Sequence, residues 1–187
     1  SGDWNGKVVE DIHKVTDYLE SLPYVDKSRI GAMGWSYGGY FMNWLQATTK
    51  RYKCFVSMMG LYNLESFYGT TEELWFPEWD LKGTPWTSKL YKEHSPSEYV
   101  KNFSTPTLII TGERDYRVSY NQSLEYFTAL QKLGIESRLI VFDNDGHWPS
   151  HTKSMPLYYN AHLEWFNKYL GGNPAPYDSK KMMRNRY

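Results

Sequence analysis

The chain has 187 residues, and its 21 Lys and Arg side chains balance its 21 Asp and Glu side chains. That length suffices for one domain with a real core, and the balanced charge gives neither a basic field for nucleic acid nor a charged tail for a partner. The balanced charge therefore predicts no nucleic-acid binding. Since no apolar run approaches the ~18 residues of a spanning helix, we also expect no membrane insertion. The single cysteine, Cys54, gives no disulfide framework.

The first 60 residues predict a helix, a strand, a second helix and a second strand. Apolar residues at spacings of three and four predict an amphipathic helix over 6–22, which Pro23 closes. The apolar run at 29–33 predicts a short buried strand. The segment 40–47 predicts a helix, and the apolar run at 54–59 predicts the second strand.

The rest of the chain predicts an irregular excursion and then more alternation of strand and helix. Gly and Pro interrupt 60–104, which predicts short helices in a segment rich in Tyr, Trp and Phe. The elements that follow are a strand over 105–112, a helix over 119–133, a strand over 137–142 and a helix over 156–170. We expect one domain over 1–172 and a loose or peripherally docked tail over 173–187.

Alternating strands and helices predict an α/β fold. Because the strands are apolar on both faces, we expect a mainly parallel sheet covered on both sides, in a three-layer αβα arrangement. Functional sites in such sheets gather at the carboxyl ends of the strands.

The stretch from Gly34 to Gly38 has the G-x-S-x-G pattern between a predicted strand and a predicted helix. This context is typical of a nucleophile elbow, a turn so sharp that the serine adopts a strained backbone conformation. We expect Gly34 and Gly38 to leave room for the close approach of strand and helix. Ser36 would stand at the helix N-terminus, where the backbone N–H of Tyr37 faces a developing oxyanion.

Two further residues complete a candidate catalytic triad. Asp115 follows the predicted strand at 105–112, and His147 follows the strand at 137–142. The order Ser, Asp, His is that of α/β-hydrolases. A serine hydroxyl needs a neutral imidazole to take its proton, and the imidazole needs a carboxylate to fix its tautomer and orientation. The sequence therefore predicts Ser36, Asp115 and His147 as catalytic residues.

Other residues compete for these roles. Asp143 and Asp145 are near His147 in sequence, but we expect them to cap the turn that presents it. His147 and His151 have a spacing of four, which would suit a metal on a helix. Pro149 argues against a helix there, and neither Glu nor Cys completes the set, so we expect no metal and no cofactor.

Several motifs resemble the prolyl oligopeptidase family of serine peptidases. They are DKSRIG at 26–31, GWSYGGY at 34–40, DYRV at 115–118 and DGH at 145–147. The middle stretches, LESFYG at 64–69 and EELWFPEWD at 72–80, are similar to the acylaminoacyl peptidase and dipeptidyl peptidase V branch. The resemblance covers nearly all of the chain apart from the tail.

This resemblance implies roles for further residues. It implies that the N–H of Tyr37 is one oxyanion donor. It implies that Arg117 binds the substrate backbone one residue before the scissile one, the alternative being an ordinary surface arginine. The pocket for the residue before the cut would be lined by Leu61, Leu64, Phe67 and Val118. Proline-preferring members usually have larger aromatics there, so the resemblance implies a preference for small or aliphatic residues.

Full members of the family also carry parts that these 187 residues do not contain. They have an N-terminal β-propeller and a complete eight-stranded hydrolase domain, whereas this chain begins near the helix before the elbow strand. The second oxyanion donor, a tyrosine hydroxyl in many relatives, and the acidic groups that grip a free substrate N-terminus lie in those parts. We therefore expect a hydrolase domain truncated at its N-terminal strands, with the upstream segment or a second copy of the chain as its partner.

The function expected from the resemblance is a serine peptidase of dipeptidyl or acylaminoacyl type, which cleaves near the N-terminus of oligopeptides through an acyl-serine. A serine esterase or other acyl hydrolase with the same triad is the first alternative, and a non-catalytic fragment is the second. The resemblance to dipeptidyl peptidase V implies a periplasmic or secreted location, with a cytoplasmic one as the alternative.

Overall fold

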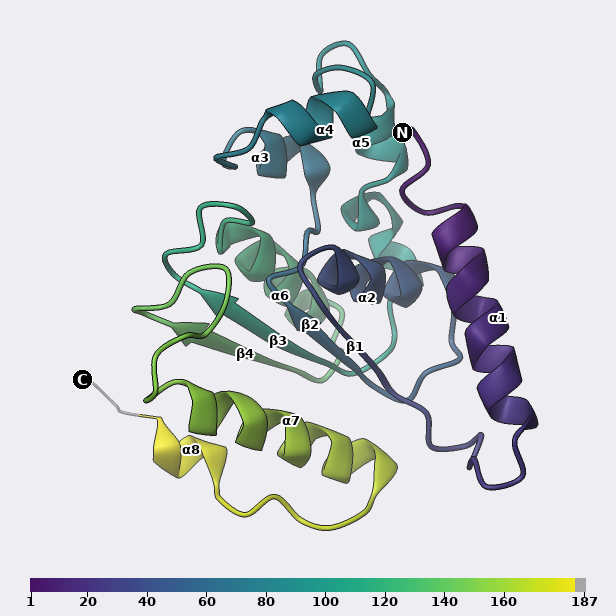
Figure 1. Cartoon of the computed structure of the whole chain (residues 1–187), viewed down its shortest axis with the longest axis vertical. Helices are drawn as coiled ribbons and strands as arrows, with labels where there is room; N and C mark the ends of the chain where they lie inside the picture. The colour runs from purple at the N-terminus through teal and green to yellow at the C-terminus, as the bar shows by residue number, and fades with distance from the viewer. Residues whose placement is uncertain (184–187) are drawn as a thin grey trace.

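Four parallel strands form the centre of the molecule, with helices on both faces, in the computed structural model shown in Figure 1. The structure describes residues 1–183. The strands are β1 (Ala32–Trp35), β2 (Phe55–Met58), β3 (Thr107–Gly112) and β4 (Ser137–Phe142), and they lie side by side in chain order. The predicted α/β architecture with a parallel sheet is confirmed.

The long helices divide between the two faces of this sheet. The helices α2 (Tyr37–Thr48) and α6 (Asn121–Lys132) cover one face, and α7 (Met155–Leu170) covers the other. The two faces separate because side chains alternate along each strand: Leu108 and Ile110 pack under α7, whereas Ile109 packs against α6. Strands β2 and β3 are buried on both faces, as their apolar runs predict.

The excursion between β2 and β3 consists of short helices, as expected. They are α3 (Leu64–Tyr68), α4 (Trp75–Asp80), α5 (Leu90–Glu93) and the 3₁₀ helix η1 (Pro96–Asn102). In Figure 1 the helices α3, α4 and α5 form a cap at one end of the sheet. Side chains of this cap share a pocket with Ser36, so the excursion covers the site that the sequence predicts.

The first strand lies later in the sequence than predicted. The pattern indicated 29–33, but β1 is paired with β2 from Ala32, opposite Phe55, to Trp35, opposite Met58. Arg29 belongs instead to a turn, where its side chain forms an ion pair of 2.6 Å with Asp26. The pairing therefore continues up to the residue before Ser36, which ties the elbow directly to the sheet.

Helix α1 (Lys7–Ser21) leaves much of its predicted apolar face uncovered. Val8, Val15 and Leu19 are 38%, 59% and 42% exposed, whereas Val9 and Thr16 are buried. Figure 1 shows that α1 lies beyond the β1 edge of the sheet. No other described strand continues the sheet past β1, so β1 is an edge strand among residues 1–183.

The tail is docked along its described part. Asn160 of α7 donates a hydrogen bond of 2.8 Å to the carbonyl of Tyr177, and the backbone N–H of Ser179 donates one of 2.6 Å to Glu164. The short helix α8 (Ser179–Met182) is thereby held on α7. Residues 184–187, which end the predicted tail, lie outside the described part of the chain. Across residues 1–183, every helix is too short or too polar to cross a bilayer.

Candidate active site

Ser36 occupies a strained turn between β1 and α2. Its φ of 58° and ψ of −117° are unusual for a residue with a side chain, and such a conformation costs about 1–3 kcal/mol. A Cβ on Gly34 would lie 2.1 Å from the carbonyl oxygen of Gly38, and a Cβ on Gly39 would lie 2.7 Å from that of Met58. The close approach therefore requires Gly34 and Gly39. A Cβ on Gly38 would meet nothing within 4 Å, so the role expected for that glycine is wrong.

The structure brings the three predicted triad residues into one hydrogen-bonded chain. The Nε2 of His147 lies 2.8 Å from the Oγ of Ser36, and its Nδ1 lies 2.7 Å from the Oδ2 of Asp115. The Asp115 side chain is fully buried, whereas that of His147 is 15% exposed. With a proton on Nδ1 donated to Asp115, Nε2 is left to accept the hydroxyl proton of Ser36.

The second oxygen of Asp115 holds the carboxylate in place. Its Oδ1 accepts hydrogen bonds from the backbone N–H groups of Arg117, at 3.0 Å, and Val118, at 2.9 Å. These two donors come from the loop that follows β3. The carboxylate is therefore satisfied on both oxygens, and the orientation of the His147 ring depends on a residue that cannot easily rotate.

The loop that carries His147 is held by Trp35 and Asp145. The indole Nε1 of Trp35 donates a hydrogen bond of 2.7 Å to the carbonyl of His147. The buried carboxylate of Asp145 accepts hydrogen bonds from Ser150 N, His151 N, His151 Nδ1 and Ser154 Oγ. Burial acts to raise the pKa of Asp145, but the hydrogen bonds from Ser154 and His151 outweigh it and hold that pKa below its usual value. Asp145 therefore organises the turn, as the sequence indicates.

Tyr37 presents its backbone N–H in the first turn of α2, where helix N–H groups have no partner within the helix. Its hydroxyl donates a hydrogen bond of 2.8 Å to the carbonyl of Trp4. Burial, with the negative charges of Asp80 and Asp3, raises the pKa of Tyr37 to about 12. The Tyr37 hydroxyl is thus already bonded to Trp4. The backbone N–H is the group of Tyr37 that can donate a hydrogen bond to an oxyanion next to Ser36.

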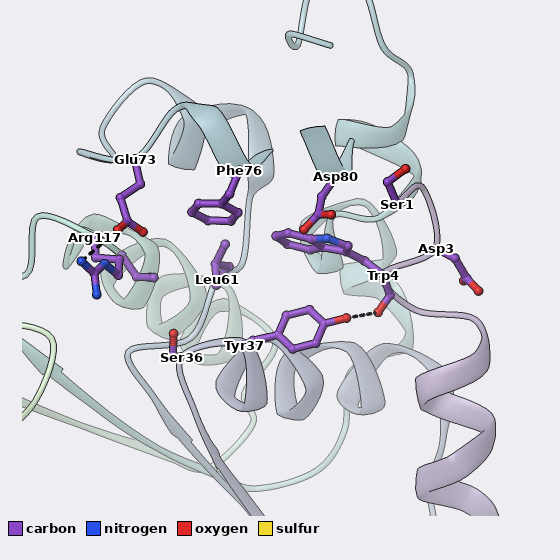
Figure 2. A pocket seen from close by; sticks show the side chains of 11 residues that line it. Ser1, Asp3, Trp4, Ser36, Tyr37, Leu61, Glu73, Phe76, Asp80 and Arg117 are labelled. Atoms are coloured by element: carbon purple, nitrogen blue, oxygen red, sulfur yellow. Dashed lines mark hydrogen bonds and ion pairs between the residues drawn. The ribbon is translucent and has the colours of Figure 1, made fainter. Parts of the chain in front are cut away.

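A pocket of about 460 Å³ opens beside Ser36 (Figure 2). Its lining residues are Ser1, Asp3, Trp4, Ser36, Tyr37, Leu61, Glu73, Phe76, Asp80, Arg117 and Val118. Leu61 and Val118 therefore line it, as the resemblance implies. Leu64 and Phe67 do not, because both are fully buried in the core below.

The pocket walls include aromatic side chains that the family resemblance does not imply. Trp4, Tyr37 and Phe76 line it, and the rings of Trp4 and Phe76 are stacked with centroids 6.4 Å apart. Neither Trp4 nor Phe76 was predicted as a site residue. The aromatic surplus of the excursion was the available signal for Phe76, whereas Trp4 reaches the pocket from the segment before α1 and has no local motif.

Arg117 lies at the pocket with its guanidinium already paired. Its Nη2 is 2.9 Å from the carboxylate of Glu73 and 3.4 Å from that of Glu72. The side chain is 46% exposed, and Figure 2 shows it on the Ser36 side of the pocket, next to Glu73. The position suits contact with a substrate backbone, and such contact would compete with Glu73 for the same donor.

Metal-ligating side chains do not gather anywhere in residues 1–183 in a group of three or more. His151, considered as a metal ligand, instead bonds Asp145 through Nδ1. His162 is buried and its Nδ1 lies 2.7 Å from the carbonyl of Tyr158. Burial also raises the pKa of the Cys54 thiol to about 12, so it is an inert packing residue.

Comparison with protein families matches residues 1–173 to the prolyl oligopeptidase family. The chain belongs to this family. Family membership accounts for the order of the triad residues and for the strand that runs into the elbow. The hydrogen-bonded geometry described above is that of a serine hydrolase site in its usual place on the sheet.

Two dipeptidyl-peptidases are similar to this chain in amino-acid sequence. The chain is 36% identical over 177 residues to dipeptidyl-peptidase 5 of Porphyromonas gingivalis, covering 91% of this chain and 26% of that protein. It is 34% identical over 171 residues to dipeptidyl-peptidase 5 of Schizosaccharomyces pombe, covering 89% of this chain and 25% of the relative. The chain therefore spans about a quarter of the length of these relatives.

A solved structure extends the likeness to three dimensions. The acylaminoacyl peptidase of Pyrococcus horikoshii superposes with a TM-score of 0.82 at 26% identity, over 94% of this chain and 29% of that one. An acylaminoacyl peptidase in complex with Z-Gly-Gly-Phe-chloromethyl ketone gives the same TM-score at 27% identity, over 94% of this chain and 29% of its own. The α/β-hydrolase fold of the family is thus the fold of this chain.

Proposed function

We propose that this chain carries the catalytic centre of a serine peptidase that cleaves near the N-terminus of peptides, of dipeptidyl or acylaminoacyl type. The observation that carries the proposal is the chain of hydrogen bonds from Ser36 through His147 to the buried Asp115, with distances of 2.8 Å and 2.7 Å. A serine in a strained elbow with an aligned imidazole is arranged for nucleophilic attack.

The reaction follows from this geometry. His147 takes the proton of Ser36 as the oxygen attacks the carbonyl carbon, and the resulting imidazolium is stabilised by Asp115. The N–H of Tyr37 donates to the oxyanion that forms. The imidazolium then protonates the leaving amine, which gives an acyl-serine. A water molecule, activated by the neutral imidazole, hydrolyses this ester and restores Ser36.

Peptides are favoured over simple esters as substrates for two reasons. The similar proteins include dipeptidyl and acylaminoacyl peptidases, one of them solved with Z-Gly-Gly-Phe-chloromethyl ketone. In this chain, Arg117 lines the same pocket as Ser36, which supports a role for its guanidinium in holding a peptide carbonyl. An esterase with the same triad is the second candidate, because the acyl-serine chemistry is common to both.

Labelling with an alkyl fluorophosphonate tests the nucleophile. The chain is co-expressed with an upstream hydrolase segment from a relative, and this complex is the unmodified protein in this test and in those that follow. Ser36 should be labelled, and both Ser36→Ala and His147→Ala should lose the labelling while retaining the fold. Asp115→Asn should leave a folded protein that reacts about 10⁴-fold more slowly, because the imidazole is then held in the wrong tautomer. Ser104→Ala, at an exposed serine away from the triad, is the control and should label normally. Absence of labelling in the unmodified protein would contradict the proposal.

A pair of substrates then separates the two candidate functions. Rates are measured with a dipeptide anilide and with a short-chain ester that has no peptide bond. A peptidase should hydrolyse the anilide with an efficiency that Arg117→Ala lowers selectively. Hydrolysis of the ester with no turnover of any peptide anilide would favour the esterase.

We also propose that a segment outside these 187 residues, or a second copy of the chain, completes the site and covers β1. The uncovered stripe of α1 and the unpaired edge of β1 support this proposal. A periplasmic or secreted location is the corresponding proposal for the compartment, supported by the dipeptidyl-peptidase 5 relatives. Fractionation of cells that express the natural gene tests it against a cytoplasmic location.

A further inference from the structure

The pocket beside the nucleophile ends in a carboxylate that the proposed chemistry does not use. Ser36 lies on one side of the pocket and Asp80 on the other, with Leu61 and Phe76 between them in Figure 2. Asp80 is the last residue of α4 and is half-buried. At about 460 Å³, the cavity is within the size range of ligand pockets, roughly 300–1,000 Å³.

Among the pocket carboxylates, Asp80 is the one that faces the cavity without an ion pair, and the terminal ammonium of Ser1 also lines the pocket. Glu73 is neutralised by Arg117, which lies 2.9 Å away. Asp3 points away from the cavity in Figure 2 and accepts the backbone N–H of Lys7. Within residues 1–183, no cation forms an ion pair with Asp80. Its field is felt at the neighbouring phenol, since after burial it is the next cause of the raised pKa of Tyr37.

Aromatic rings surround the approach to this carboxylate. Trp4 and Phe76 are stacked at an interplanar angle of 11°, and the ring of Tyr37 meets that of Trp4 edge-on at 5.3 Å. Aromatic faces attract cations and also pack against the methylene stems of lysine and arginine. A carboxylate at the end of an aromatic channel is therefore complementary to an apolar stem with an ammonium or guanidinium head.

We propose that Asp80 is a specificity-determining residue, which selects substrates with lysine or arginine as the residue before the cut. This inference rests on the proposed peptidase function and deepens it. The side chain of that residue enters the pocket from the acyl carbon bound to Ser36, passes Leu61, and places its charged head against Asp80. The small or aliphatic preference implied by the family resemblance is replaced, because Leu64 and Phe67 do not line the pocket.

The α-ammonium group of a short peptide could also form an ion pair with Asp80. The test must therefore separate this group from the charged side chain of lysine or arginine. The probes are dipeptidyl diphenyl phosphonates, in which the Oγ of Ser36 forms a bond to phosphorus, one P–O bond to phenol breaks, and phenol leaves with the serine proton. The residue that carries the phosphonate is the analogue of lysine, norleucine or glutamate. Each probe is made with an acetylated and with a free N-terminus.

The unmodified protein is expected to react about tenfold faster with the lysine probe than with the norleucine probe of the same N-terminus, which has the same stem without the charge. Asp80→Asn should bring this ratio close to one, and Asp80→Lys should favour the glutamate probe. Asp11→Asn, the same charge change at an exposed site on α1, is the matched control and should keep the ratio. In the unmodified protein, added salt should reduce the lysine preference by screening Asp80.

Three outcomes would overturn the inference. They are equal rates with the lysine and norleucine probes in the unmodified protein, a lysine preference that survives in Asp80→Asn, and an Asp80→Asn substitution that slows the lysine and norleucine probes with free N-termini to the same extent. Labelling by a simple alkyl fluorophosphonate separates these outcomes from failure of the peptidase function. If Ser36 reacts with that reagent while the probe ratio is flat, the inference alone is wrong; if it reacts with neither, the proposed function is wrong as well.

Discussion

The indole of Trp35 donates a 2.7 Å hydrogen bond to the backbone carbonyl of His147, and so joins the strand before the nucleophile to the loop that carries the base. The two rings also lie 4.9 Å apart. Trp35 therefore holds the position of both reacting residues, because it directly precedes Ser36 in the chain and bonds the backbone of His147. A positioning role for Trp35 follows, because displacement of the loop would move Nε2 of His147 away from Ser36.

Trp35→Phe is expected to lower kcat about three- to tenfold with little change in KM, because it removes one hydrogen bond and keeps an aromatic ring. Rates with a dipeptide anilide measure the effect. Trp148→Phe is the matched control: Trp148 is also partly exposed and packs on Trp35, at 5.2 Å, and the loss of its indole should change kcat less. Equal effects of the two substitutions would show that Trp35 acts only through packing.

Asp145→Ala should lower the free energy of unfolding by about 3 kcal/mol at pH 7, because several donors lose a buried charged acceptor. The pKa of Asp145 lies below its usual value of 3.8 in the folded state. Its stabilising contribution is therefore present above the unfolded-state pKa and is lost as the pH falls through the folded-state pKa.

Urea unfolding at pH 7 and at pH 3 checks both parts of the Asp145 prediction. The difference in stability between the unmodified protein and Asp145→Ala should shrink at the lower pH. Asp11→Asn, at an exposed aspartate on α1, should behave like the unmodified protein. A stability difference that is independent of pH would mean that the Asp145 charge does not contribute.

Arg117→Ala should weaken hydrolysis of a peptide anilide about ten- to a hundredfold more than that of a small ester, because a charge-assisted hydrogen bond to a substrate carbonyl is worth about 1.5–3 kcal/mol. Arg114→Ala, at an exposed arginine that bonds Asn144 at 2.9 Å, is the control. Glu73→Gln is a second test: it should improve the kcat/KM of the peptide, because it releases Arg117 from an ion pair. Equal losses for peptide and ester in Arg117→Ala would make Arg117 structural.

The 187-residue chain, expressed alone, should be dimeric or prone to aggregation and nearly inactive. The edge of β1 is unpaired among the described residues. Met33 of this strand and Val15 and Leu19 of α1 are 49%, 59% and 42% exposed. An exposed apolar strand edge is a site of association. The family resemblance implies that the second oxyanion donor lies upstream of these residues. Loss of one such donor lowers activity roughly a hundred- to a thousandfold. Light scattering and a dipeptide anilide assay measure the two properties.

The double substitution Met33→Lys and Val15→Lys should shift the isolated chain towards monomer, since it places charges on this surface. Leu133→Lys, at an exposed leucine after α6, should leave association unchanged. Co-expression with an upstream hydrolase segment from a relative should raise both solubility and activity. A monodisperse monomer with brisk peptidase turnover would contradict the prediction.

The sequence by itself determined the elements and the triad of this protein. Strand and helix periods are local, and the elbow requires serine and glycine at set spacings, so Ser36, Asp115 and His147 were recognisable before their contacts were known. The four strands were found with errors of a few residues at their ends. The largest shift is at β1, where the last paired residue is Trp35 and an apolar pattern alone could not locate the end of pairing.

Only the tertiary structure decided which residues face the pocket and which faces remain uncovered. Leu64 and Phe67 have the apolar character of a pocket wall, but the packing of α3 turns both into the core. Trp4 and Asp80 come from segments 76 positions apart in the sequence and meet at the pocket through the packing of the excursion on the N-terminal segment. Likewise, the period of α1 predicts an apolar stripe, and the position of α1 beyond β1 decides that the stripe is exposed. A local pattern records the chemistry of a side chain, whereas its neighbours depend on long-range packing.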